Sequence, residues 1–135
     1  MQDTTICLSV PNFSGNEKKY VNEAIDAEWV STAGAFISRF EEEMAKTLEV
    51  PQACACQSGT AGLHLCLRHF GVGAGDIVLV PTLTFIAPIN AVMYQAATPV
   101  FFDCDSHMCM DAGQVEEYLS RECRVEDGKT VEISS

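Results

Sequence analysis

The strongest constraint on the fold of this chain is an alternation of short apolar runs with helical segments in its second half. Residues 77–80 form a continuous β-branched and aliphatic run, which is typical of a strand covered on both faces. Similar runs occur at 53–57 and 99–102. Apolar residues at helical spacing follow the runs at 53–57 and 77–80. Strands that alternate with helices pair in parallel through helical crossovers, so we expect an α/β fold with a mainly parallel sheet.

Single residues predict where several helices begin and end. Ser14 with Glu17 three residues later is a capping-box pattern, so a helix is expected to begin at Ser14. Asp111 with Gln114 predicts the start of the last helix in the same way. Gly71 is expected to end the helix that follows the 53–57 run, because glycine adopts the left-handed conformation of a helix C-terminus.

These boundaries divide the chain into two regions. An apolar stripe at helical spacing resumes after a loop of mainly small residues at 29–34. We therefore expect N-terminal helices over 14–48 and βα units over 53–119. The tail after residue 125 is polar.

Composition narrows the class of protein. The chain has 135 residues and a formal net charge of −11, without a basic stripe, so we expect no binding to a nucleic-acid backbone. No apolar stretch approaches the roughly 18 residues of a membrane span, and no secretory signal is evident. The seven cysteines are odd in number and lack zinc-type spacing. They favour buried, reduced thiols and a cytoplasmic protein, with exposed thiols as the alternative for Cys104 and Cys109.

Three loops follow the predicted strands, at the edge where parallel α/β sheets bind ligands. Residues 58–60 open a helix, whose N-terminal N–H groups favour an anion such as phosphate; an equal alternative is that Ser58 only caps the helix. Phe85, in the second loop, either stacks on a flat cofactor ring or belongs to the core. In the third loop, Asp103 and Asp105 are expected to form a turn, and we expect no metal site.

Five sequence motifs occur in a fixed order along the chain. They are SVPNFSGNE (9–17), WVSTAG (29–34), SGTA (58–61), VPTLTFIA (80–87) and PVFFDCD (99–105). Together they closely resemble the DegT/DnrJ/StrS family of pyridoxal-phosphate (PLP) aminotransferases, which act on nucleotide-linked keto-sugars. The second and fourth segments look most like the LegC and perosamine-synthase branch, which aminates C4 of a 4-keto-6-deoxy sugar nucleotide.

The resemblance implies a fold, partners and residue roles. The fold would be the N-terminal part of an aspartate-aminotransferase-like (type I) large domain in a homodimer, with glutamate as the amino donor. The turn of Gly59, Thr60 and Ala61 would hold the PLP phosphate, and Phe85 would stack on the pyridine ring. Trp29, Ser31 and Thr32 would line the sugar-nucleotide side of the pocket, and Thr82 and Thr84 would shape the same wall.

One departure from the family concerns its catalytic lysine, which lies downstream of the position of Ser135. None of the four lysines here, Lys18, Lys19, Lys46 and Lys129, matches it. We therefore expect residues 1–135 to be part of a longer enzyme, incomplete at the C-terminus and inactive alone. Three alternatives stay open: a non-catalytic remnant or binding partner, a parent that dehydrates sugars with His in place of the Lys, and an unrelated α/β module that binds another phosphate.

Overall fold

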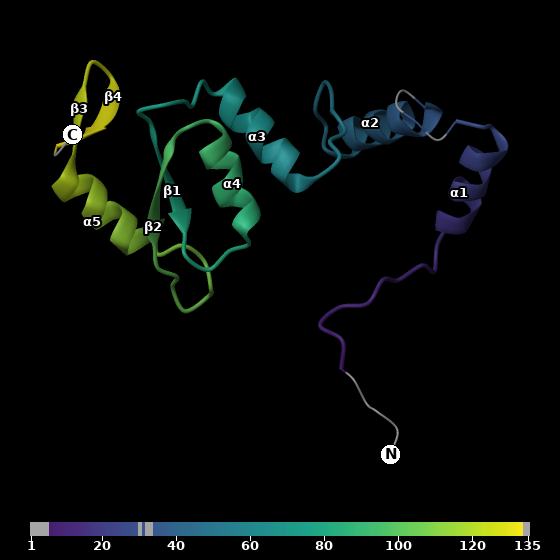
Figure 1. Ribbon diagram of the computed structural model, residues 1–135, viewed down its shortest axis with the longest axis horizontal. Coiled ribbons are helices and arrows are strands. Elements are labelled where there is room, and N and C mark those ends of the chain that lie inside the picture. Colours follow the sequence, from purple (N-terminus) through teal and green to yellow (C-terminus); the bar gives the residue numbers. More distant parts are fainter. Residues whose placement is uncertain (1–5, 30, 32–33, 134–135) are drawn as a thin grey trace. The chain divides into compact units, whose positions relative to one another are not determined.

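The computed structural model describes residues 6–29, 31 and 34–133. They belong to two compact units, Met1–Ala55 and Cys56–Ser135 (Figure 1). The first unit is helical, and the second unit contains every strand that the structure describes. None of the described helices has the length and apolar character needed to cross a membrane.

The first unit contains α1 (Glu17–Asp26) and α2 (Ala35–Thr47). Asn16 stands at the N-cap of α1 without a side-chain bond, and the Glu17 carboxylate accepts the N–H of Gly15 at 2.9 Å. The prediction that this helix begins at Ser14 is therefore wrong, because Glu17 satisfies a donor that lies before the helix. The rings of Tyr20 and Phe36, 5.7 Å apart between centroids, join the two helices.

Residues 53–57, predicted as a buried strand, form no strand. None of the described strands pairs with this segment. Its side chains still alternate, since Ala53 and Ala55 are half-buried whereas Cys54 and Cys56 are exposed. The N–H of Ala55 donates to the Glu41 carboxylate at 2.8 Å, so a side chain takes the place of a neighbouring strand. The apolar pattern was present, but a strand also requires a partner for its backbone groups.

The second unit confirms the predicted parallel pairing. Its elements up to the second strand are α3 (Gly59–His69), β1 (Ile77–Pro81), α4 (Ile86–Tyr94) and β2 (Thr98–Phe102). β1 and β2 pair in parallel, with Ile77 opposite Thr98 and Pro81 opposite Phe102. α4 is the crossover helix, and Pro88 lies in its first turn, where a missing N–H costs no helical hydrogen bond.

The end of α3 is also as predicted. Gly71 adopts a positive φ of 76° just past the C-cap Phe70. The N–H of Gly71 donates to the carbonyl of Arg68 at 3.1 Å, and that of Val72 to the carbonyl of Leu67 at 3.0 Å. These two bonds are a Schellman motif, which satisfies the last carbonyls of the helix and turns the chain toward β1.

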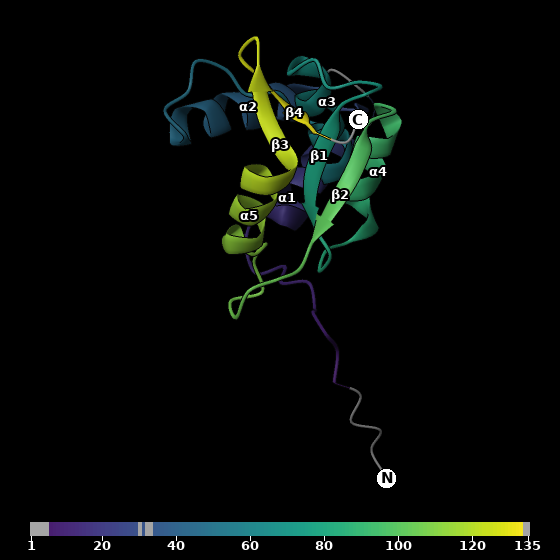
Figure 2. The ribbon, with the colours of Figure 1, turned by 90° about the vertical axis from the view of Figure 1, so that its left-hand side faces the viewer.

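The core of the second unit is small. Val80, Val92 and Ala97 are buried and meet partly buried side chains of α3, α4 and β1. On the other side of the β1–β2 pair lies α5 (Ala112–Glu122), whose Tyr118 ring contacts Phe102 edge-on at 5.4 Å between centroids (Figure 2). Val80 is the one fully buried residue of β1, so the predicted cover on both faces is only partial among the described residues.

The cysteines correct a second expectation about burial. None of the seven is buried in the structure, and only Cys104 and Cys123 are even half-buried. The buried class holds just five hydrophobic side chains among the described residues. A core of that size has no room for the thiols that the sequence predicts inside it.

An antiparallel hairpin after α5 is missing from the sequence predictions. It consists of β3 (Cys123–Glu126) and β4 (Lys129–Glu132). Asp127 and Gly128 join the strands with positive φ of 49° and 77°, the pattern of a type I′ turn. The Asp-Gly pair between short alternating runs was the available signal.

Candidate functional site

Two of the three predicted loops lie side by side at the carboxyl edge of the β1–β2 pair. The N–H of Thr82 donates to the carbonyl of Phe102 at 2.8 Å, which extends the ladder one residue beyond β1. The loop after β1 and the loop after β2 therefore begin next to each other. The loop at 57–60 follows no strand in this structure, so the same reasoning does not place it at that edge.

The first turn of α3 has the chemistry of an anion site. Ser58 is the N-cap, and its hydroxyl oxygen accepts the N–H of Ala61 at 3.2 Å. The first bond to a helix carbonyl comes from Gly62, which donates to Ser58 at 3.1 Å. The N–H groups of Gly59 and Thr60 consequently have no acceptor within the helix. Capping by Ser58 and anion binding are thus compatible, although sequence reasoning treated them as alternatives.

The surroundings of this turn suit a phosphate. The first turn of α3 contains no acidic residue, and the helix dipole places partial positive charge there. A Cβ built on Gly59 would meet no atom within 4 Å, so the backbone is open to a ligand. Thr60 adds a hydroxyl beside the two N–H groups. Phosphate oxygens, which are strong acceptors, match this set of donors.

Phe85 is not a core residue. It occupies the N-cap position of α4, with φ −67° and ψ 161°, and its side chain is 87% exposed. Leu83, Thr84 and Phe85 line a shallow hollow beside the carboxyl edge. Phe85 is therefore not buried in the core of the second unit, and its stacking on a flat ligand stays a prediction.

Trp29 and Ser31 lie in the first unit, between α1 and α2. They line a pocket of about 250 Å³ with small side chains of both helices and with Phe36 and Ile37. Gly34 lies directly against the indole, because a Cβ on Gly34 would be 2.6 Å from Cδ1 of Trp29. Thr32, which was predicted with them, lies outside the described residues.

The predicted site residues therefore form separate groups. Thr84 and Phe85 are neighbours at the start of α4, and Gly59, Thr60 and Ala61 make the first turn of α3. Trp29 and Ser31 form the group of the first unit.

The loop after β2 has the turn structure expected of its two aspartates. The Asp105 carboxylate accepts the N–H groups of His107 and Cys109 at 2.8 and 3.0 Å. The Asp103 carboxylate accepts the N–H of Cys104 at 2.8 Å. Among the described residues, no group of three or more potential metal ligands gathers.

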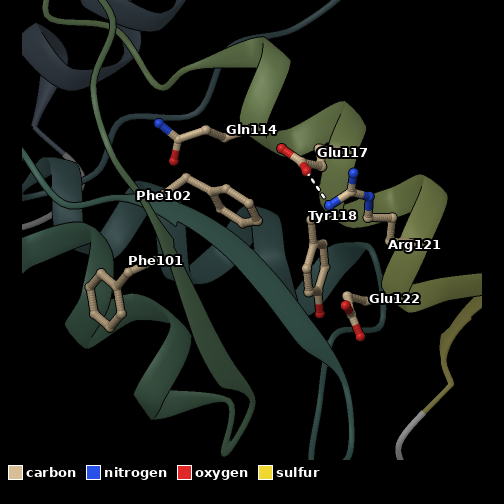
Figure 3. Close-up of a pocket in the computed structure, with 7 residues that line it drawn as sticks. All are labelled: Phe101, Phe102, Gln114, Glu117, Tyr118, Arg121 and Glu122. Atoms are coloured by element: carbon tan, nitrogen blue, oxygen red, sulfur yellow. Dashed lines mark ion pairs between the residues drawn. The ribbon is translucent and has the colours of Figure 1, made fainter.

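A second hollow, of about 330 Å³, lies between β2 and α5 and was not predicted (Figure 3). Glu117 and Arg121 form an ion pair on α5 at its rim. The positive charge of Arg121 at this hollow is therefore neutralised by Glu117. Tyr118 stands beside Phe102 in the same view.

Tyr118 also links α5 to the hairpin. Its hydroxyl donates to the Glu132 carboxylate at 2.7 Å, and the N–H of Ile133 donates to the carbonyl of Glu122 at 2.7 Å. The hydrogen bond to Glu132, together with burial and the negative charge, raises the pKa of Tyr118 to about 12. The hydroxyl therefore stays protonated and keeps its donor role at neutral pH.

The parallel β1–β2 pair with its crossover helix α4 defines an α/β protein, and the first turn of α3 presents N–H groups without a helical acceptor. Residues 11–125 match the DegT/DnrJ/EryC1/StrS aminotransferase family, and the chain belongs to that family. An unrelated phosphate-binding module is thereby excluded. The match ends at residue 125, inside β3, so the turn of the hairpin and β4 lie beyond it.

Two curated relatives illustrate the likeness. The GDP-perosamine synthase of Escherichia coli O157:H7 is 40% identical over 115 residues, which cover 84% of this chain and 32% of that protein. The GDP-perosamine synthase of Caulobacter vibrioides is 43% identical over 116 residues, covering 85% and 31% respectively. The chain thus spans about a third of the length of these relatives.

Solved structures agree with the family. The protein named sugar aminotransferase Spr1654 from Streptococcus pneumoniae, in its PLP form, has a TM-score of 0.74 and 30% identity. That comparison covers 83% of this chain and 29% of the other. The same protein has also been solved in its PMP form, with a TM-score of 0.73. The neighbours confirm the predicted fold class.

Proposed function

We propose that this chain supplies the N-terminal part of a PLP-dependent aminotransferase. The complete enzyme would transfer an amino group from glutamate to a 4-keto-6-deoxy sugar nucleotide, for surface-polysaccharide or nonulosonate sugars. The family match over residues 11–125 is the observation that carries this proposal, and the likeness to two GDP-perosamine synthases supports its substrate class. Residues 1–135 would be an incomplete major domain of a homodimer, and the odd number of cysteines supports a reducing, cytoplasmic location.

The cofactor would be held by two groups of the second unit. The N–H groups of Gly59 and Thr60 and the Thr60 hydroxyl would bind the PLP phosphate, while the N–H of Ala61 stays with Ser58. Phe85, exposed beside the carboxyl edge, would stack on the pyridine ring. When bound, PLP withdraws electrons from the carbon that carries the transferred amine.

The substrate would meet a different set of residues. Trp29, with an indole that is 55% exposed, offers a flat apolar face to a sugar or base. Ser31 and Thr32 would add hydroxyl groups for hydrogen bonds to the sugar nucleotide, and Thr84 would do so beside Phe85. The match of the motif at 29–34, which contains Trp29, Ser31 and Thr32, to the family supports this assignment.

The four lysines of the chain lie outside the two segments assigned here to the cofactor. Lys18 and Lys19 lie on α1, Lys46 lies in the last turn of α2, and Lys129 begins β4. None belongs to the first turn of α3 or to the loops at the carboxyl edge. The amine that binds the cofactor aldehyde would therefore come from elsewhere in a longer protein, and so would the choice between transamination and dehydration.

A binding experiment on the 135-residue chain tests the cofactor assignment. PLP should bind reversibly, should be displaced by inorganic phosphate, and should leave on dialysis. Gly59→Asp places a carboxylate among the phosphate-binding N–H groups and should weaken PLP binding more than tenfold, because like charges repel at short range. Gly73→Asp is the matched control, since its Cβ also meets no atom within 4 Å. Equal PLP affinity in the two variants would refute the assignment.

A further inference from the structure

We infer that Asp103 is a positioning residue, which joins the two loops of the carboxyl edge and so fixes the turn that presents Thr84 and Phe85. The joint itself consists of contacts in the second unit. Its role toward a bound cofactor rests on the proposed function, because that function assigns the ligand of Phe85.

The joint begins in the backbone. The N–H of Thr82 donates to the carbonyl of Phe102 at 2.8 Å, so the residue after β2 lies next to the residue after β1. Oδ1 of Asp103 accepts the hydroxyl of Thr82 at 3.4 Å and the N–H of Cys104 at 2.8 Å. One carboxylate oxygen thus bridges the loop that follows β1 and the loop that follows β2.

Asp103 is itself anchored to the start of α5. Its carbonyl accepts the N–H of Asp111 at 2.9 Å, and its N–H donates to Oε1 of Gln114 at 3.4 Å. Asp111 in turn caps α5, because its carboxylate accepts the N–H of Gly113 at 2.8 Å. The helix start therefore fixes Asp103 on one side, and Asp103 can hold Thr82 on the other.

The turn at residues 82–85 depends on such a tie because it buries little. Leu83 is 53% exposed and Phe85 is 87% exposed. Side chains with so much exposure contribute little packing to hold a turn in one conformation. The direction of the Phe85 ring is therefore set by the two ends of the turn, which are the first turn of α4 and the contacts of Thr82.

Amide hydrogen exchange of the 135-residue chain, followed by NMR, tests the joint. Asp103→Ala should speed exchange at the amides of Thr82 and Cys104 by about fivefold, the factor expected for the net loss of one hydrogen bond. Asp103→Asn should restore wild-type rates, since its amide oxygen accepts the same bonds. Asp76→Ala is the matched control: this carboxylate accepts the N–H of Gly73 at 2.8 Å just before β1, at the opposite end of that strand.

Thr82→Val separates the two bonds of the Asp103 carboxylate and keeps the test decisive if Asp103→Ala does not fold. The valine variant should exchange faster at residue 82 while Cys104 keeps its protection. Rates at residue 82 that equal those of Asp76→Ala, in both Asp103→Ala and Thr82→Val, would overturn the inference.

The ratio of PLP affinity to inorganic phosphate affinity tests the role toward the cofactor. In Asp103→Ala this ratio should fall about fivefold while the affinity for phosphate stays unchanged, because only PLP has a ring that Phe85 can contact. An unchanged ratio would overturn the positioning role of Asp103. A wild-type chain that binds no PLP would refute the proposed function instead, and hydrogen exchange would still decide whether Asp103 joins the loops.

Discussion

Replacing Gly34 by alanine should displace the Trp29 indole. The added Cβ would lie 2.6 Å from Cδ1 and 3.2 Å from Nε1 of Trp29. The first distance is at least 0.8 Å short of the 3.4 Å at which ordinary contact begins, so the ring must move. The φ of Gly34 is −75°, which any residue adopts, so the effect is steric and not a matter of backbone conformation.

The loss of stability caused by Gly34→Ala depends on how easily the Trp29 indole can move away. Overpacking a closed core costs about 1–3 kcal/mol. The indole is 55% exposed and can swing toward solvent, so we expect the lower end of that range. Thermal unfolding of the variant should therefore show a modest loss of stability, of about 1 kcal/mol.

Fluorescence reports the displacement directly, because Trp29 is the only tryptophan of the chain. The emission of Gly34→Ala should shift to longer wavelength, and quenching by acrylamide should increase as the ring enters water. Gly62→Ala is the matched control: its Cβ meets no atom within 4 Å, and it should leave the emission unchanged. A folded Gly34→Ala variant with wild-type emission and quenching would refute the close packing of Gly34 on Trp29.

Three further predictions concern helix ends and the hairpin. Asp111→Ala should lower stability by about 1 kcal/mol in thermal unfolding, whereas Asn16→Ala, at an N-cap without a side-chain bond, should have almost no effect. Glu28→Gly should raise stability by roughly 1 kcal/mol, because Glu28 has a φ of 54° that glycine adopts without strain. The raised pKa of Tyr118, about 12 against 10.0, means that its contribution to stability is complete below pH 10 and is lost as pH rises through 12. Absorbance at the tyrosinate band should show this late ionisation in wild type, and Glu132→Gln should move it to lower pH; an unchanged titration in that variant would disprove the Glu132 contact.

Local patterns predicted the βα half of the fold well. The run at 77–80 and the glycine at position 71 specify their elements through neighbouring residues, and both predictions are confirmed. The run at 53–57 has an equally apolar pattern but forms no strand, because pairing depends on a partner that local sequence does not specify. The hairpin was missed for the opposite reason: its strands are short and polar, and only the Asp127-Gly128 turn marks them.

The candidate site shows the same division between local and tertiary information. The open N–H groups at Gly59 and Thr60 follow from Ser58 and the helix start, so sequence reasoning could find them. The 87% exposure of Phe85 shows that it is not a core residue of the second unit, which its sequence neighbours could not show, and stacking on a cofactor stays a prediction. The contact of Gly34 with Trp29 lies within the loop between α1 and α2, and the bridge from Asp103 to Thr82 joins the loops after β2 and β1. Neither contact follows from a periodic pattern in the sequence, so only the structure reveals them.

We propose that the second unit binds PLP through the first turn of α3 and the Phe85 loop. A titration of the ¹⁵N-labelled chain with PLP, followed by amide chemical shifts, tests it most directly. We expect the largest shift changes at Gly59 and Thr60 and a second group of changes at Thr84 and Phe85. Inorganic phosphate should reproduce only the first group. Shifts concentrated on the hairpin around Lys129, or none at saturating PLP, would contradict it.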